Sequence, residues 1–478
     1  MKKTGMILFI LLLMLSLSTG CSNQENSITE SNNTTDNNLE QISNKASQSD
    51  ADMFTDRDYR TAYDENESIL IHLNGDSATA SSNSVKISGS TVQITEEATY
   101  IISGTLNNGI ILVDAEDTAK LQIVLNGVSI TNESSAALYI LSADKVFVTL
   151  AEGTENTLAN GGSFIAIDEN NIDAVVFSKQ DLTFNGTGNL IITSPNGNGI
   201  VGKDDLVFTG GNYTINTSSH GIEANDSVRI TGTTQITVDA GKDGIHCENN
   251  DDTSLGFIYI SAGTLNIEAE GDGISASAYM QIVDGTFSVL AGGGSENGSS
   301  QSSNTWGAFM GGDMPPGQQS SSNTATTEDS TSMKGIKTSG TLNIFSGSFQ
   351  INSSDDCIHS NSSITIYGGT FELASGDDAV HADETLTVTA CDMNISESYE
   401  GLEALHIDIQ GGTIKLVATD DGLNAAGGTD SSGTIGGRDG MFGGGRGGMG
   451  GMNSSSNGTI VISGGDLYIN ASGDGIDA

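Results

Sequence analysis

The sequence predicts an all-β fold, a parallel β-helix in which successive coils of the chain stack into a solenoid. Two observations lead to it. Short runs of Val, Ile, Leu, Thr and Tyr alternate with Gly, Asn and Asp from residue 68 onward, and no stretch has a convincing helical period. In the second half, a turn repeats about every 22 residues, which suits one coil of a β-helix. Leucine-rich repeats share this period, but their Leu/Asn pattern is absent.

Residues 1–20 have the pattern of a signal peptide. Lys2 and Lys3 precede an apolar run that is too short to span a bilayer, and small residues then precede Cys21. This arrangement resembles a bacterial lipobox, although Ser18 stands where leucine is usual. We therefore expect Cys21 to be lipidated and to anchor the protein on the extracellular face of the cell membrane. The alternative is ordinary secretion.

The next segment, residues 21–53, is polar and almost without large apolar side chains, which predicts a disordered tether. The predicted β-helix domain follows at 54–478. Two stretches rich in Gly, Ser and Met, 292–333 and 427–458, interrupt its period and are expected to be loops that leave one face. They are interpreted either as binding flaps or as tolerated insertions.

An aliphatic position recurs in each coil and predicts an internal ladder, because stacking buries the aliphatic side chains of neighbouring coils. Neighbouring coils are expected to lie about 4.8 Å apart, the spacing between strands. The aligned aliphatic residues are Ile200, Ile222, Ile245, Ile274, Ile336, Ile358, Val380, Leu402, Leu423 and Ile476.

Acidic residues gather in four successive turns next to this ladder. Stacked carboxylates repel one another, so they require a neutralising cation, and Ca²⁺ with its oxygen ligands is the simplest candidate. The alternative is ordinary turn chemistry, in which the side chains cap backbone amides. The predicted calcium ligands are Asp355, Asp356, Asp377, Asp378, Glu400, Glu403, Asp420 and Asp421.

Basic side chains also fall in these turns. His359 and His381 lie one coil apart and are expected to be polar surface positions that hydrogen-bond a ligand, with a transition-metal site as the alternative. Lys334 and Lys337 interrupt the acidic column, so calcium is not assigned there. Only three cysteines remain beyond Cys21. Because this number is odd, we expect no disulfide framework, and stability must come from stacking of the coils or from metal.

The charge of the chain limits its partners. Acidic residues outnumber basic ones 61 to 17, for a formal net charge of -44, which argues against a nucleic-acid partner. An anionic polymer or membrane surface is also repelled unless a cation lies between, so contact with a membrane is expected only through the N-terminal lipid.

Several stretches resemble a family of bacterial secreted carbohydrate-binding proteins: Phe54–Asp58, Leu125–Ile130, Asp144–Leu158 and the repeated Gly-Asp-Gly-Ile turns. The resemblance covers roughly residues 54–478. It implies a right-handed, single-stranded parallel β-helix like that of pectate lyases, bound calcium held by acids of the turns, and an acidic or plant-type polysaccharide as ligand without established catalysis.

We therefore expect a monomeric cell-surface lipoprotein that binds polysaccharide and is not an enzyme. One alternative is a polysaccharide lyase that abstracts a proton beside a calcium-neutralised carboxylate, with Lys337 as the candidate base. Its acidic neighbours would raise its pKa and weaken it in that role. The other alternative is a structural or adhesive envelope protein without a defined glycan.

Overall fold

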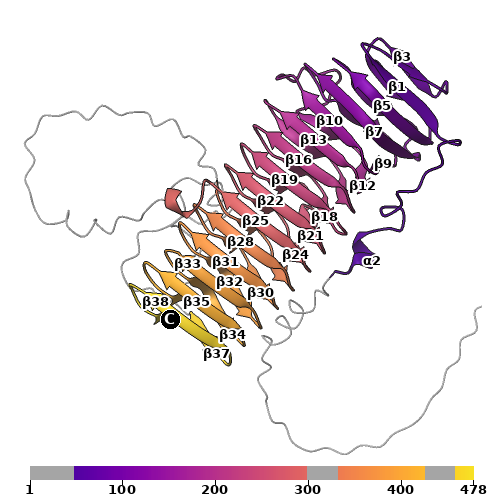
Figure 1. Cartoon of the computed structure of the whole chain (residues 1–478). Helices are drawn as coiled ribbons and strands as arrows, with labels where there is room; N and C mark the ends of the chain where they lie inside the picture. Colours follow the sequence, from indigo (N-terminus) through magenta and orange to yellow (C-terminus); the bar gives the residue numbers. More distant parts are fainter. Residues whose placement is uncertain (1–47, 299–331, 426–457) are drawn as a thin grey trace, which may run out of the picture. The chain divides into compact units, whose positions relative to one another are not determined.

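The computed structural model describes residues 48–298, 332–425 and 458–478 (Figure 1). Contacts divide the chain into two units, Met1–Ser47 and Gln48–Ala478, and the second contains every described residue. Cys21, the expected signal peptide and most of the expected tether lie outside the described residues, as do most of the two insertions. No helix among the described residues is long and apolar enough to cross a membrane.

Strands dominate the second unit, and only two short helical turns occur among the described residues: α2 (Asp50–Met53) and the 3₁₀ turn η1 (Ser295–Asn297). Most strands pair in parallel with the corresponding strand of the next coil, so that the strands form three stacked columns. Figure 1 shows the coils following one another from β1 to β38. The prediction of an all-β parallel solenoid is confirmed, whereas its right hand stays a prediction.

The first column follows the repeated turns. It consists of β4 (Thr91–Ile94), β6 (Ile110–Asp114), β8 (Leu138–Ser142), β11 (Ala174–Ser178), β14 (Asn198–Gly202), β17 (Ile222–Ala224), β20 (Ile245–Cys247), β23 (Ile274–Ala276), β26 (Ile336–Thr338), β29 (Ile358–Ser360), the first parts of β32 (Val380–Val388) and β34 (Leu402–Ile409), β36 (Leu423–Asn424) and β39 (Ile476–Asp477).

The second column begins with the first parts of three long strands and ends near the C-terminus. It consists of β1 (Ile69–Gly75), β5 (Thr99–Leu106), β7 (Lys120–Asn132), β9 (Lys145–Leu150), β12 (Asp181–Gly186), β15 (Asp205–Phe208), β18 (Ser227–Ile230), β21 (Phe257–Ile260), β24 (Met280–Ile282), β27 (Leu342–Ile344), β30 (Ser363–Ile366), the second parts of β32 and β34, and β37 (Thr459–Ile462).

The third column takes the second parts of β1, β5 and β7. It continues through β10 (Glu155–Asn160), β13 (Asn189–Ser194), β16 (Asn212–Thr217), β19 (Gln235–Ala240), β22 (Thr264–Ala269), β25 (Thr286–Ala291), β28 (Ser348–Ser353), β31 (Thr370–Ser375), β33 (Asp392–Glu397), β35 (Thr413–Ala418) and β38 (Asp466–Ala471). Two antiparallel pairings occur in the first coils, β1 with β2 (Ala78–Ala80) and β3 (Val85–Ser88) with β4.

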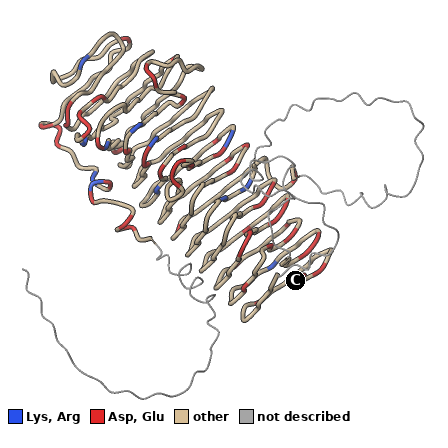
Figure 2. Tube along the Cα trace, turned by 180° about the vertical axis from the view of Figure 1, so that it is seen from behind, with Lys and Arg blue, Asp and Glu red and all other residues tan. Residues whose placement is uncertain are grey.

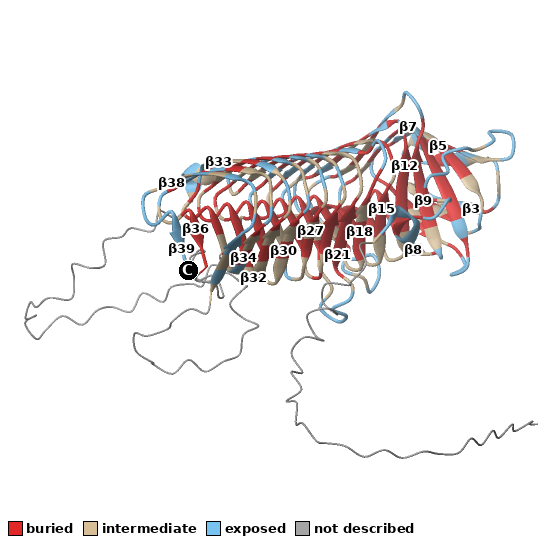
Figure 3. Cartoon of the chain, turned by 90° about the horizontal axis from the view of Figure 1, so that it is seen from below, coloured by how far each residue is buried: buried red, intermediate tan, exposed pale blue. Residues whose placement is uncertain are grey.

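The predicted aliphatic ladder is confirmed residue by residue. All ten aligned positions, from Ile200 in β14 to Ile476 in β39, are register partners along the first column. Nine of them are buried, and Ile476 in the last strand is half exposed. Figure 3 shows the buried residues along the inside of the coils. The same ladder extends toward the N-terminus through Val92, Ile111, Leu138 and Val176, which lack the turn signature.

Aromatic side chains form a second internal stack in the third column. The rings of Phe287, Phe349 and Phe371 are register partners with centroids 4.7 Å apart and planes 3° apart. The glycine two residues before each ring has a positive φ, 116° at Gly369, which L side chains rarely adopt. This explains the repeated Gly-Thr and Gly-Ser pairs that precede these strands.

Residues 48–53, which the sequence assigns to the tether, contact the second column. Met53 is buried, and the Tyr259 hydroxyl donates to the carboxylate of Asp50 at 2.8 Å. The amide of Gln281 exchanges hydrogen bonds with the backbone of Gln48. Burial of Met53 and satisfied polar groups hold this segment, and contacts group it with the rest of the solenoid.

Candidate functional site

The acidic turns lie directly before the strands of the first column, and Figure 2 shows acidic residues recurring there in the C-terminal coils. In six of these turns the residue before the aligned glycine position points its side chain toward the next coil. Its oxygen accepts a hydrogen bond from the backbone N–H of the equivalent residue one coil later, at 2.6–3.2 Å. The acceptor–donor pairs are Asn198–His220, Asp243–Asp272, Asp272–Lys334, Asp356–Asp378, Asp378–Glu400 and Asp421–Asp474.

These hydrogen bonds agree in part with the alternative interpretation, in which acidic side chains of the turns cap backbone amides. The side chains do cap backbone amides, but the amides belong to the neighbouring coil rather than to the same turn. A backbone N–H inside the stack needs a partner, and in these six turns a side-chain oxygen of the preceding coil supplies it. The aspartates of this position therefore hold the coils together through their Oδ1 atoms.

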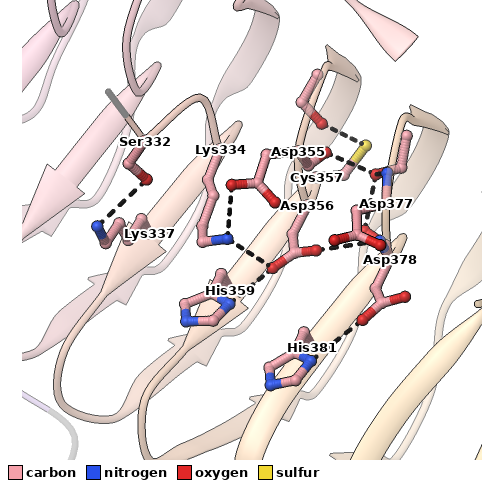
Figure 4. A network of polar contacts seen from close by, with 12 residues as sticks. Ser332, Lys334, Lys337, Asp355, Asp356, Cys357, His359, Asp377, Asp378 and His381 are labelled. Atoms are coloured by element: carbon pink, nitrogen blue, oxygen red, sulfur yellow. Dashed lines mark hydrogen bonds and ion pairs between the residues drawn. The ribbon is translucent and has the colours of Figure 1, made fainter. Parts of the chain in front are cut away.

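Three of these aspartates bind a histidine through the remaining oxygen. The histidine lies three residues later, and Nδ1–Oδ2 distances are 2.8 Å for Asp243–His246, 2.7 Å for Asp356–His359 and 3.2 Å for Asp378–His381. Figure 4 shows the last two pairs on adjacent coils. The signal in the sequence is a histidine two places after the aligned glycine position, which marks a contact with the aspartate three residues before it. The surface position expected for His359 and His381 is wrong, because both side chains are buried inside the stack.

Lys334 lies inside the acidic column and pairs with two of its carboxylates. Its ammonium is 2.8 Å from Oδ2 of Asp355 and 3.0 Å from Oδ2 of Asp356, and its side chain is only 4% exposed. The sequence suggested that Lys334 interrupts the column. Instead this lysine supplies part of the positive charge that the sequence analysis assigned to calcium at Asp355 and Asp356.

The two neighbouring histidines differ in charge although their rings stack, with centroids 4.9 Å apart. Burial and the ammonium of Lys334 lower the pKa of His359 to about 4, so its imidazole is neutral at pH 7. Burial also disfavours the charged form of His381. The carboxylates of Asp378, Asp383 and Glu403 outweigh that effect and raise the pKa of His381 well above its usual value.

His359 also has an unsatisfied ring nitrogen. The side chain is 2% exposed, and its Nδ1 contacts Asp356. Its Nε2 has no hydrogen-bond partner among the described residues. Buried polar atoms are rarely left without a partner. Of the two histidines expected to hydrogen-bond a ligand, His359 leaves one buried nitrogen without a partner among the described residues, whereas His381 uses both nitrogens on carboxylates.

Three of the predicted calcium ligands gather in one place. Carboxylate oxygens of Asp355, Asp356 and Asp377 lie within 4.8 Å of one another. Burial raises the pKa of Asp356, but Lys334 and His359 outweigh burial and hold that pKa far below its usual range. These carboxylates contact the ammonium of Lys334 and the ring of His359. Hard oxygen donors of this kind fit Ca²⁺. We call Asp355, Asp356 and Asp377 the triple-aspartate cluster.

Asp378 and Glu403, two further predicted ligands, are joined by His381. Oε2 of Glu403 lies 2.9 Å from Nδ1 of His381, which also contacts Asp378. Burial raises the pKa of Asp378, whereas the hydrogen bonds from His381 and Asp378 lower that of Glu403 in spite of burial. A protonated Asp378 and a positively charged His381 therefore offset the negative charge of Glu403 within the protein.

The last three predicted ligands lie apart from these groups. Both oxygens of Glu400 accept from the amide of Asn424, at 2.8 and 2.7 Å. Burial and the charge of Glu403 raise the pKa of Glu400 to about 8. Asp420 accepts from the Tyr399 hydroxyl, and Asp421 caps the next coil. Within the described residues, these three join no cluster with metal-ligand spacing.

The structure adds one cluster that the sequence analysis did not single out. The rings of His220 and His246 stack with centroids 4.7 Å apart, and both Nδ1 atoms approach Oδ2 of Asp243, at 3.4 and 2.8 Å. Burial lowers the pKa of His246, but Asp243 and Glu248 outweigh it and raise that pKa to about 10. A protonated His246 makes this cluster an ion pair.

Comparisons with known proteins identify the family. Residues 88–379 match the family described as carbohydrate-binding domain-containing protein. A carbohydrate-binding domain-containing protein of Acetivibrio thermocellus is 36% identical over 211 residues, which are 44% of this chain and 73% of that protein. This chain belongs to the carbohydrate-binding domain-containing protein family. A solved structure, the gadolinium derivative of the polysaccharide lyase-like protein from C. thermocellum, is 36% identical and covers 47% of this chain and 92% of that chain, with a TM-score of 0.46.

The match to the carbohydrate-binding domain family contains the triple-aspartate cluster, His359 and Lys334, and it ends before Glu400. It also contains Lys337, the residue considered as a catalytic base. The ammonium of Lys337 lies 3.7 Å from Oδ2 of Asp272, and its side chain is 12% exposed. Lys337 is thus placed to neutralise a carboxylate that also caps the following coil.

Proposed function

We propose that the protein binds an acidic polysaccharide through the triple-aspartate cluster, with Ca²⁺ between the carboxylates of the protein and those of the glycan. The coarser part, a carbohydrate-binding protein, follows from the family. The finer part rests on one observation, the convergence of the carboxylate oxygens of Asp355, Asp356 and Asp377 within 4.8 Å of one another.

The three aspartates differ in burial and in their contacts, and this difference supports the proposal. Asp356 is fully buried and has its oxygens in contact with the Asp378 amide, His359 and Lys334, so it fixes the geometry. Asp355 is only partly buried, and it lies on the same cluster. Calcium accepts six to eight oxygen ligands, so ligand carboxylates and hydroxyls would complete a shell begun by the protein.

The charge of the whole chain supports a bridging cation as well. A protein with a formal charge of -44 repels a polyuronate at low salt, and this repulsion weakens both encounter and binding. A dication on the cluster cancels the negative charge there. The protein residues then need only to hold the cation and to offer hydrogen bonds, which suits a binding protein.

We further propose that Cys21 carries the lipid that holds this domain at the cell surface. The signal-like pattern of residues 1–20 supports this location, and the polar residues that follow would act as a spacer between the membrane and the solenoid.

Retention on immobilised polygalacturonate tests the proposed function. We expect wild-type protein to be retained in buffer with Ca²⁺ and to elute with a calcium chelator. Calcium should also raise the melting temperature more than Mg²⁺ does, because Mg²⁺ prefers a rigid octahedral shell. Equal retention with and without calcium would refute the bridging role, and no retention on any acidic or neutral glycan would refute the ligand class.

A further inference from the structure

A basic cleft lies at the opposite end of the solenoid from the triple-aspartate cluster in the order of coils. It has a volume of about 330 Å³, within the range of small-ligand sites. Its walls come from β5, β7 and β9 on one side and from the segment before β1 on the other. The cleft is lined by Arg57, Arg60, Glu97, Ala98, Thr99, Lys120, Gln122 and Phe147.

Three cationic side chains on one small cleft are unusual for this chain. Only 17 of its 478 residues are Lys or Arg, and 61 are acidic. Glu97 is the single acid among the lining residues. Neither arginine forms an ion pair with another residue of the described ranges. Their charge is therefore available to an anion from outside.

Asp58, which lies between the two arginines, fixes the segment that carries them. Its side chain is buried, and its carboxylate accepts from Thr183 at 2.6 Å and pairs with Lys145 at 2.9 Å. Its backbone carbonyl accepts from Asn185 and Thr209. These anchors come from successive coils of the second column, so the positions of the arginines are set before any ligand arrives.

Arg57 is held in a definite orientation. Its guanidinium carbon lies 4.7 Å from the centroid of the Phe147 ring, and Nη2 donates to the carbonyl oxygen of Lys120 at 2.9 Å. Stacking on an aromatic ring leaves the other N–H donors of the fork in the plane of the guanidinium. Such a fork matches the two oxygens of a carboxylate.

The other lining groups point to a sugar acid rather than to a simple inorganic anion. Glu97 accepts from the backbone N–H of Lys120, and Thr99 and Gln122 hydrogen-bond each other. Glu97 repels a bare anion but accepts hydrogen bonds from hydroxyls, and Thr99 and Gln122 both donate and accept. A uronate presents a carboxylate and hydroxyls on one ring, so it satisfies both kinds of group.

We propose that this cleft binds the carboxylate of an acidic sugar residue directly, without a metal ion, through Arg57 and Arg60. The choice of a sugar ligand rests on the proposed function. The site itself is separate, because its charge complements an anion without calcium whereas the triple-aspartate cluster requires a cation.

Calorimetric titration with trigalacturonate in buffer freed of divalent cations tests the proposal on the full chain. We expect Arg60→Gln to lower the affinity at least tenfold, the size of effect typical for loss of a charge-assisted hydrogen bond. Arg57→Lys keeps the charge but loses the fork and should also weaken binding. Lys86→Gln, an exposed change in β3 with the same loss of charge, should not. Unaltered melting temperatures would show that the variants are folded.

Several results would overturn the proposal. Absence of binding without divalent cations would refute it, and would leave the calcium-dependent function untouched. Equal affinity of Arg60→Gln and wild type would place the ligand elsewhere. Equal binding of galactotriose would show that the carboxylate is not recognised, and equal competition by inorganic sulfate would show a general anion site. Binding that is lost in Arg60→Gln but persists in a variant of the triple-aspartate cluster would support the proposal.

Discussion

Oδ1 of Asp356 accepts a hydrogen bond from the backbone N–H of Asp378, one coil later, at 3.0 Å. The remaining oxygen of Asp356 contacts both His359 and Lys334. One buried carboxylate thus joins three successive coils, because Lys334 lies one coil before it and Asp378 one coil after. This double use explains why aspartate recurs at a position where a turn alone would accept asparagine or glycine.

Substitutions at Asp356 should distinguish its hydrogen bond to the Asp378 amide from its charge interaction with Lys334. Asp356→Asn keeps an oxygen for the Asp378 amide but removes one of the two carboxylates that contact the buried ammonium of Lys334. Asp356→Ala loses both functions and should destabilise the protein by about 3–5 kcal/mol, as expected when one partner of a buried pair is removed. Thermal unfolding without divalent cations should rank wild type above Asn and Asn above Ala. Asp392→Ala, an exposed loss of the same charge, should change little; a similar loss there would contradict the account.

The Asp243–His246 pair should make stability depend on pH above neutrality. Burial disfavours the charge of His246, but Asp243 and Glu248 raise its pKa to about 10, against about 6.5 in an unfolded chain. A raised pKa stabilises the fold fully below pH 6.5, and this contribution is lost as pH rises through 10. Melting temperatures at pH 6, 8 and 10 should fall more steeply for wild type than for His246→Gln. Parallel curves would show that His246 is not protonated in the folded protein.

The aromatic stack should be a main source of stability in the central coils. Phe349 lies between Phe287 and Phe371 and is buried, so Phe349→Ala removes two stacked contacts and leaves a cavity. We expect a loss of about 3–5 kcal/mol. Tyr367 stacks on Phe345 but is 44% exposed, so Tyr367→Ala should cost much less. Denaturant unfolding of both variants measures the difference, which should vanish only if the internal stack is loosely packed.

Cys21 should decide where the protein resides. Cys21→Ser removes the expected lipid acceptor, so the variant should move from the membrane fraction to the medium while its melting temperature is unchanged. Cell fractionation measures this. Recovery of the wild type from the medium would mean that the protein is simply secreted.

The sequence identifies the fold because its turns repeat. Ten ladder positions could be aligned from Ile200 onward, since a small residue directly precedes the aliphatic residue in each of these coils. Val92, Ile111, Leu138 and Val176 occupy the same ladder but have no such turn before them. These four residues are recognised as ladder positions only from their burial and strand register in the structure. Both properties depend on how the coils stack.

The acidic residues of the candidate site were predictable from the sequence, but their contacts with one another and with Lys334 were not. Acidic turns are visible in the sequence, and the structure gathers Asp355, Asp356 and Asp377 among them. The ion pairs of Lys334 with Asp355 and Asp356 depend on the stacking of two coils, which brings its ammonium next to the following turn. The basic cleft could not be read from the sequence, because Arg57 and Phe147 are 90 positions apart and meet only where Asp58 fixes its segment against the second column.

The most direct test of the calcium-bridged function is calorimetric titration of polygalacturonate into wild-type protein and into a double variant, Asp355→Asn with Asp377→Asn, in buffer with Ca²⁺. The variant keeps Asp356 and its contacts with the Asp378 amide, His359 and Lys334, so it should stay folded. A control variant with the exposed pair Asp239→Asn and Asp392→Asn loses the same charge. The account predicts at least tenfold weaker calcium-dependent binding in the cluster variant and unchanged binding in the control. Equal calcium-dependent affinity in the wild type and the cluster variant would contradict it.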